Sequence, residues 1–261
     1  MPTPPLLTAD ALTLTLGQRT LCRGLSLSVH AGEWWVVLGP NGVGKSTLLA
    51  TLAGLRGATA GTITFAGRPL TQWSVREQAQ WRGWLAQTPF FPGDATVLEA
   101  VLVGRHPYLG RWGWETAADL AIAREALAAV DLAGFEARRL HTLSGGEKQR
   151  VAIATLLAQQ PRVYLVDEPT NHLDLRHQRQ VLEHFAARCR AGATVVAALH
   201  DLNWAVRYAT HAILLSLDGD TEVGEAATLL TAERLSALYG LSLVACGNPP
   251  LRHFIPSDAA S

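Results

Sequence analysis

The chain has 261 residues, of which 48% are hydrophobic and 17% are charged, so it can bury a substantial core and has neither a disordered nor a fibrous composition. Its 22 basic and 22 acidic residues give a formal net charge of zero, which removes the electrostatic argument for nucleic acid as the main partner. The three cysteines, Cys22, Cys189 and Cys246, lie far apart without metal-ligand spacing, so neither a disulfide framework nor a structural zinc site is expected.

The sequence gives no sign of a targeting or membrane-spanning segment. Residues Met1–Asp10 contain three prolines but neither the basic nor the apolar region of a secretory signal. No apolar run approaches the roughly 20 residues that a spanning helix needs. We therefore expect a protein that is soluble by itself and reaches a membrane only through a partner.

The first part of the chain is expected to form strands and then one helix. Residues Leu6–Val29 alternate apolar and polar side chains, which predicts half-exposed antiparallel strands. Glu33–Leu38 is nearly continuously apolar, as in a strand covered on both faces. A helix is expected over Lys45–Leu55 and a further strand over Thr62–Phe65.

The next part, from about Ser74 to Leu132, carries helical signals, and its best amphipathic pattern runs over Glu115–Val130. It is expected to form a helical subdomain. The remaining predicted elements alternate between helix and strand, which implies a parallel sheet. They are a helix through Gln159, a strand Val163–Val166, a helix Asp174–Arg190, a strand Thr194–Leu199, a strand Ile213–Leu217 and a helix Thr231–Tyr239.

A glycine-rich loop follows the strand Glu33–Leu38 directly. Residues Gly39–Ser46 fit the pattern GxxxxGK[ST] between a predicted strand and a predicted helix, which is the context that a phosphate-binding loop requires. Backbone N–H groups of such a loop face the phosphates, Lys45 adds a positive charge and the Ser46 hydroxyl can bind Mg²⁺. The residues expected to bind ATP are Gly39, Pro40, Asn41, Gly42, Val43, Gly44, Lys45, Ser46 and Thr47.

Two carboxylates end the strand Val163–Val166. A strand that ends in Asp-Glu is by itself more often a solvated strand end, but ligands of open α/β sheets bind at this edge. Beside a phosphate loop, Asp167 is expected to hold Mg²⁺ and Glu168 to polarise the attacking water as general base.

A second possible anion site opens the helix through Gln159. Ser144, Gly145 and Gly146 present a hydroxyl and free N–H groups, although a simple helix cap would use the same residues. Together with the loop and the Asp-Glu strand, the run Leu143–Arg150 (LSGGEKQR) resembles the ATP-binding-cassette (ABC) ATPases over nearly the whole chain. This resemblance implies one α/β P-loop NTPase domain over residues 1–261, with N-terminal antiparallel strands, a mainly parallel RecA-like core sheet and a helical subdomain inserted at about 88–150.

The resemblance also implies a head-to-tail dimer with shared nucleotides. Ser144–Gly146 of one copy would face the γ-phosphate held by the other copy, and Asp174 would communicate across the dimer. Gln87 matches the glutamine that senses Mg²⁺ and the attacking water, and His200 matches the switch histidine. Alone, a glutamine, a helix-capping aspartate or a histidine is normally an ordinary polar residue.

The sequence departs from the family at the adenine contact. The family usually places an aromatic residue in the N-terminal strands, but the matching region offers Leu16 and Arg19 instead. An apolar or guanidinium contact with adenine is therefore expected.

The region after Gln87 points to what the ATPase drives. In this family it receives the membrane subunit, and here it is rich in aromatic and basic side chains that suit either an interface or a subdomain core: Phe90, Phe91, Arg105, His106, Tyr108, Arg111, Trp112 and Trp114. Residues Val101–Trp112, Thr170–Asp174 and His200–Asn203 look like importers of iron-siderophore, haem and cobalamin.

That likeness implies a second copy of the chain, a membrane permease and, indirectly, a periplasmic substrate-binding protein as partners, and a place on the cytoplasmic face of the inner membrane. ATP and Mg²⁺ are the implied cofactors, and no nucleic acid partner is expected. The alternatives are a non-transport ABC ATPase acting on ribosomes or DNA, which usually has two cassettes or long coiled coils, and a P-loop kinase for a small molecule, against which the LSGG run argues.

Overall fold

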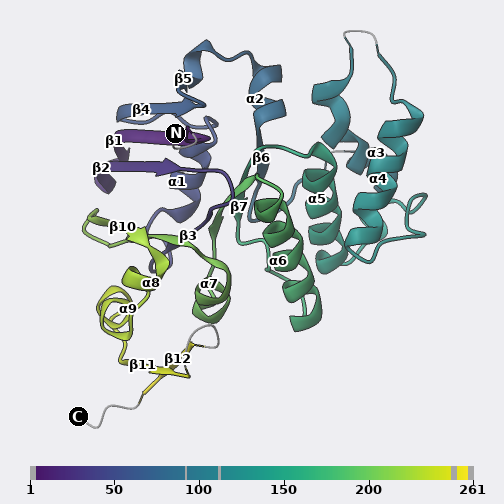
Figure 1. Ribbon diagram of the computed structural model, residues 1–261. Helices are drawn as coiled ribbons and strands as arrows, with labels where there is room; N and C mark the ends of the chain where they lie inside the picture. Colours follow the sequence, from purple (N-terminus) through teal and green to yellow (C-terminus); the bar gives the residue numbers. More distant parts are fainter. Residues whose placement is uncertain (1–3, 92, 111–112, 248–251, 258–261) are drawn as a thin grey trace.

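The computed structural model describes residues 4–91, 93–110, 113–247 and 252–257 (Figure 1). Its N-terminal part contains an antiparallel sheet of order β2-β1-β4-β5, formed by β1 (Leu7–Leu16), β2 (Arg19–Val29), β4 (Ala60–Phe65) and β5 (Arg68–Pro69). The alternating apolar residues of β1 and β2 are buried on one face, because successive side chains of a strand point to opposite faces. The predicted N-terminal antiparallel strands are therefore confirmed.

The central sheet has six strands in the order β10-β9-β3-β8-β7-β6. All neighbours pair in parallel except β10, which is antiparallel to β9. The strands are β3 (Trp34–Leu38), β6 (Arg82–Leu85), β7 (Val163–Asp167), β8 (Thr194–Ala198), β9 (His211–Leu215) and β10 (Thr221–Glu225).

The strand β3 shows why its sequence is continuously apolar. Trp34, Val36 and Leu38 belong to one core, shared with the helices of the second half of the chain. Trp35 and Val37 belong to a second core, shared with α1 (Lys45–Leu52) and the antiparallel sheet. Both faces are therefore covered, as in other parallel sheets.

The helices around this sheet begin with recognisable caps. Four of them, α2 (Val75–Trp81), α3 (Val97–Leu102), α4 (Ala117–Ala129) and α5 (Gly145–Gln159), start with a capping box. Figure 1 shows α3, α4 and α5 grouped beside the sheet. The helix α5 passes residue 150 without a break, so the boundary of the predicted helical subdomain at about 88–150 stays a prediction.

The remaining helices lie in the second half of the chain. They are α6 (Leu175–Arg190), α7 (Leu202–Tyr208), α8 (Ala226–Leu229) and α9 (Ala232–Tyr239). Short 3₁₀ turns η1 (Leu70–Gln72), η2 (Val103–Tyr108) and η3 (Leu140–Thr142) join other elements. A small hairpin, β11 (Leu243–Cys246) with β12 (His253–Pro256), lies near the C-terminus against α7.

Some sequence-based expectations were wrong. The stretch Ser74–Leu132 is not helical throughout, because β6 lies within it and pairs with β7. The predicted strand Ile213–Leu217 instead spans His211–Leu215, since the N–H of Gly219 donates to Ser216 O in a turn. The elements α7, β10, β11 and β12 were not expected at all.

Candidate functional site

The glycine-rich loop lies between the end of β3 and the start of α1. Gly39 is buried with a φ of 153°, and a Cβ added there would lie 2.4 Å from the carbonyl oxygen of Leu215. Only glycine can therefore start the loop at this point. Gly44 then caps α1 in the left-handed region, so the N-terminus of α1 follows the loop at once.

Lys45 is bound to the loop that it follows. Its ammonium donates to the carbonyl oxygens of Gly39 at 2.8 Å and Pro40 at 3.2 Å. Burial lowers the pKa of Lys45, and the negative charges of Glu168 and Asp167 oppose that shift. The single cation of the loop is thus close enough to both carboxylates to feel their charge.

The first carboxylate, Asp167, is the last residue of β7 and is only 2% exposed. Burial raises its pKa, with the Ser46 hydroxyl as the largest opposing influence. Its Oδ1 atom is buried without a hydrogen-bond partner in the described part of the chain.

This unpartnered oxygen fits a magnesium ion. The donor set of Ser46, Gln87 and Asp167 supplies only oxygen ligands, and Mg²⁺ is usually bound through one or two carboxylates together with substrate phosphates. Within residues 4–91, 93–110, 113–247 and 252–257, no group of three or more His, Cys, Asp or Glu side chains could form a metal cage. The cleft therefore suits a cation that arrives with phosphates.

The second carboxylate, Glu168, sits in the left-handed region with a φ of 50°. Its Oε2 accepts a hydrogen bond from Gln87 Nε2 at 2.8 Å and another from Asn171, and its Oε1 pairs with His200 Nε2. The side chain of Glu168 is 7% exposed and that of His200 is 45% exposed. Glu168 is thus held from two sides in a strained backbone conformation, a feature that clusters at active sites.

These groups border one cleft of about 470 Å³. Its lining includes Asn41, Gly42, Gly44, Lys45, Ser46, Thr47, Gln87, Glu168 and His200. Leu16 and Arg19 line it too, and Arg19 Nη1 donates to Gly42 O at 2.9 Å. No Phe, Trp or Tyr side chain belongs to the described lining, and the apolar and guanidinium contacts with adenine stay a prediction.

The structure does not bring the Ser-Gly-Gly segment to this cleft. Ser144 caps α5, where its hydroxyl accepts from the N–H of Glu147 and its own N–H donates to the Glu147 carboxylate at 2.7 Å. An added Cβ at Gly146 would lie 2.7 Å from His172 O, so this glycine packs on the backbone before α6.

Asp174 also lies outside the cleft lining. It caps α6 and accepts from the backbone N–H and the ring Nδ1 of His177, both at 2.9 Å. These hydrogen bonds lower the pKa of Asp174. Within one chain, Ser144–Gly146 and Asp174 therefore act as helix caps.

Two contacts at the site were not predicted from the sequence. Asn171 follows Glu168 by three residues and donates to it, and its place in the run Glu168–Asn171 was the available signal. The Gly39 N–H donates to the Tyr239 hydroxyl at 3.3 Å, across 200 residues, and nothing in the local pattern indicates this contact.

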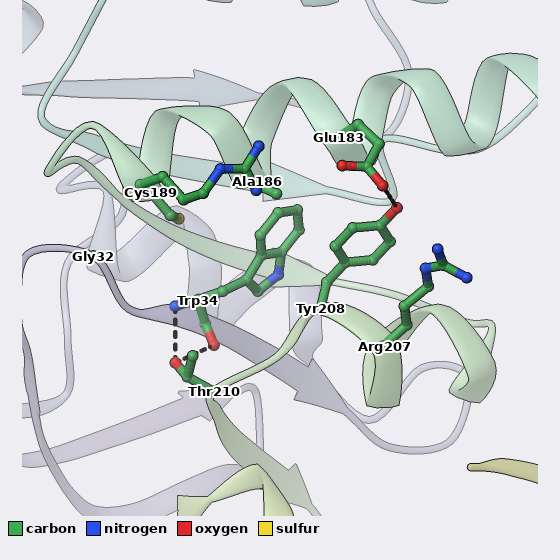
Figure 2. A pocket seen from close by; sticks show the side chains of 9 residues that line it. Gly32, Trp34, Glu183, Ala186, Cys189, Arg207, Tyr208 and Thr210 are labelled. Carbon is green, nitrogen blue, oxygen red and sulfur yellow. Dashed lines mark hydrogen bonds between the residues drawn. The ribbon is translucent and has the colours of Figure 1, made fainter. Parts of the chain in front are cut away.

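Another cavity, of about 600 Å³, lies at the other end of β3 (Figure 2). Trp34, Glu183 and Tyr208 line it, and none of the predicted site residues does. Two pairs of its lining residues are hydrogen-bonded: the Tyr208 hydroxyl donates to Glu183 Oε1 at 2.9 Å, and Thr210 Oγ1 bonds the backbone of Trp34. This cavity has a greater volume than the cleft beside the phosphate loop but contains none of the predicted site residues, so volume alone does not identify the reactive site.

The aromatic and basic residues after Gln87 include both buried and exposed side chains. Arg105 is buried, donates to Asp119 Oδ1 at 2.9 Å and lies over the ring of Tyr108, so of the two roles left open by the sequence it has the one in the subdomain core. Phe90 and Trp114 are each 85% exposed. Arg111 and Trp112 lie outside the described residues.

Comparison with known proteins agrees with this geometry. The family model described as "ABC transporter" matches residues 22–171. The hemin import ATP-binding protein HmuV of Gloeobacter violaceus is 41% identical over 253 residues, 94% of this chain and 91% of that protein. The ferric enterobactin transport ATP-binding protein FepC of Escherichia coli K12 is 37% identical over 267 residues, 98% of this chain and 97% of that protein.

A solved structure gives the same result for the fold. A chain of a metal-chelate type ABC transporter in an inward-facing conformation superimposes with a TM-score of 0.82 at 28% identity. The match covers 97% of this chain and 98% of that one.

Proposed function

Because the chain belongs to the ABC transporter family, as its ATP-hydrolysing subunit, we propose that it powers import of an iron chelate, either haem or a ferric siderophore. The names of the relatives HmuV and FepC support this substrate class. Cobalamin, the third cargo implied by the sequence resemblance, has no such support and enters as a comparison in the test.

One observation carries the assignment of the catalytic machinery. Asn41, Gly42 and Gly44–Thr47 of the phosphate loop line one cleft together with Gln87, Glu168 and His200. Asp167 precedes Glu168 at the end of β7, and a hydrogen bond with Ser46 opposes the rise of its pKa on burial. In this arrangement the loop N–H groups and Lys45 bind the phosphates of ATP. Mg²⁺, held by Ser46, Asp167 and Gln87, would neutralise charge on the phosphates.

Glu168 is the proposed general base. Because Gln87 and Asn171 donate to Oε2 and His200 pairs with Oε1, the carboxylate is fixed where it can accept a proton from an attacking water. His200, whose side chain is 45% exposed, would contact the γ-phosphate. Leu16 and Arg19 would contact the adenine.

The second copy is the proposed source of the remaining ATP contacts. Ser144–Gly146 and Asp174 do not line the cleft of their own chain. A head-to-tail dimer would place this segment, with its helix N-terminus, against the γ-phosphate in the partner's cleft. Each ATP would then lie between two chains.

The permease is the proposed membrane partner. No helix in the described ranges has the length and apolar character needed to cross a bilayer. The exposed side chains Phe90 and Trp114, at 85% each, suit aromatic anchors of an interface. On this proposal the chain would bind the permease at the cytoplasmic face of the inner membrane, and a periplasmic binding protein would deliver cargo to the permease.

Uptake by a deletion strain tests the proposal. Labelled haem, a ferric siderophore and cobalamin are supplied to cells lacking this chain, to cells complemented with the wild type and to cells with Glu168→Gln. We expect loss of uptake of one iron chelate, restored only by the wild type. Loss of cobalamin uptake alone, or unchanged uptake of all three, would overturn the iron-chelate assignment, and phosphate transfer to a small acceptor would indicate a kinase.

A further inference from the structure

The C-terminal segment, residues 231–247 and 252–257, reaches two loops of the nucleotide cleft, although it lies beyond the residues 22–171 that the family model matches. It contains α9 and the hairpin β11–β12. These parts are joined, because the N–H of Leu243 donates to Ser236 Oγ at 2.9 Å and Ser236 belongs to α9. The segment can therefore act on both loops as one body.

The first contact is with the start of the phosphate loop. The Gly39 N–H donates to the hydroxyl of Tyr239, the last residue of α9, at 3.3 Å. On the other side of this residue, the Gly39 carbonyl accepts from Lys45 Nζ at 2.8 Å. Two hydrogen bonds through one glycine thus connect α9 to the phosphate-binding lysine.

Gly39 has little freedom to relax if this contact is lost. The carbonyl oxygen of Leu215 lies against its Cα, within 2.4 Å of where a Cβ would be. Gly39 is buried, so an N–H without a partner would be costly. Burial also raises the pKa of Tyr239, which keeps the hydroxyl protonated.

The second contact is with the helix that follows the switch histidine. Asp201, next to His200, caps α7 by accepting from the N–H of Asn203 at 2.7 Å. The Oδ1 of Asn203 accepts from the N–H of Phe254 in β12 at 2.9 Å. Phe254 itself is buried in the core, so the hairpin is anchored.

We propose that the C-terminal segment, residues 231–247 and 252–257, is a positioning brace: it fixes the phosphate loop and the His200 loop relative to each other, and Tyr239 acts on ATP affinity through Gly39 and Lys45. The proposal rests on the assignment of Gly39–Thr47 as the phosphate site. Tyr239 and Asn203 are positioning residues, because each acts through another residue of the cleft.

The variant Tyr239→Phe tests the first contact, since it removes only the hydroxyl, which accepts from the Gly39 N–H. Tyr208→Phe is the control: its hydroxyl donates to the Glu183 carboxylate, and its ring stacks on Trp34 at the opposite end of β3, with centroids 5.3 Å apart (Figure 2). Affinity is measured on the full chain by titration with a fluorescent ATP analogue and Mg²⁺, and the melting temperature is recorded beside it.

We expect Tyr239→Phe to weaken ATP binding about three- to tenfold, the effect of one lost hydrogen bond. Tyr208→Phe should stay within about twofold at a similar loss of melting temperature. Unchanged affinity in Tyr239→Phe, or an equal loss in both variants, would overturn the role of Tyr239. If Lys45→Ala also kept its affinity, the phosphate-site assignment would fall instead, so the two failures are distinct.

The Asn203 contact gives a second test that does not depend on the folding of the tyrosine variant. Asn203→Leu removes the acceptor for the Phe254 N–H, whereas Asn203→Asp keeps an oxygen there. We expect the leucine variant to lower kcat at saturating ATP, through misplaced His200, and the aspartate variant to recover most of the rate. Equal kcat in the wild type and both variants would overturn the proposal that the C-terminal segment positions the His200 loop.

Discussion

Replacing the proposed general base by its amide, Glu168→Gln, separates chemistry from binding. The structure predicts that the fold tolerates it, because the amide oxygen can take the place of Oε2 and accept from Gln87 and Asn171 while the NH₂ faces His200. What is lost is the ability to take a proton from water. General-base catalysis contributes about 10²- to 10⁴-fold to a rate, or roughly 3–5.5 kcal/mol of barrier.

We therefore expect phosphate release by Glu168→Gln to fall at least 100-fold, on the order of the lower limit for a general base, with ATP affinity within about twofold. Trapped ATP should stabilise the closed dimer, which light scattering with and without ATP would detect. Glu183→Gln is the control, because this carboxylate bonds Tyr208 away from the cleft. Phosphate release near the wild-type rate in Glu168→Gln would refute the assignment of the base.

Three further predictions concern binding, dimerisation and stability. Lys45→Ala should weaken ATP binding itself in a direct titration, and undiminished affinity would contradict the phosphate-loop assignment. Ser144→Arg should leave ATP binding by one chain intact but abolish dimer-dependent hydrolysis; mixing it with Lys45→Ala should restore at most one composite site, and no activity in the mixture would leave sharing between chains unsupported. Hydrogen bonds from Thr116 and then Arg105 hold the pKa of Asp119 at about 2, so its contribution to folding is present above about pH 4 and lost as the pH falls toward 2. Urea unfolding should show Asp119→Asn less stable than the wild type at pH 7, with the difference shrinking between about pH 4 and 2; a difference independent of pH would exclude the ionised pair as its origin.

The elements next to the phosphate loop could be predicted because their signals are local. A continuously apolar strand, the loop from Gly39 and the helix from Lys45 follow one another in the sequence, and the Asp167–Glu168 pair ends another such strand. The strand β6 was missed because its four residues have no alternation of their own and become a strand only by pairing with β7. Pairing of this kind depends on residues about 80 positions later in the sequence, beyond any local window.

The undecided and missed side chains share the same cause. The aromatic and basic neighbours of Arg105 in the sequence left its role open between an interface and a core, and the fold buries it against Asp119 on α4. The Tyr239 contact with Gly39 joins the ends of two elements that are sequentially remote. Burial and partner choice at such positions follow from the tertiary fold, whereas periodicity reports only the face of a helix or strand.

In the structure, the groups proposed for hydrolysis are distinct from those proposed to contact the adenine ring of ATP. The groups proposed for phosphate binding and proton transfer are fixed by directed hydrogen bonds, among them Lys45 to Gly39 and Gln87 to Glu168. On the adenine side, Leu16 is 54% exposed and can offer only apolar contact, and one donor of Arg19 is already bonded to Gly42. Apolar contact and stacking on a guanidinium discriminate weakly between purines, because neither reads the hydrogen-bonding edge of the base. We therefore expect the protein to discriminate less between ATP and GTP than between a nucleoside triphosphate and nucleotides with fewer phosphates.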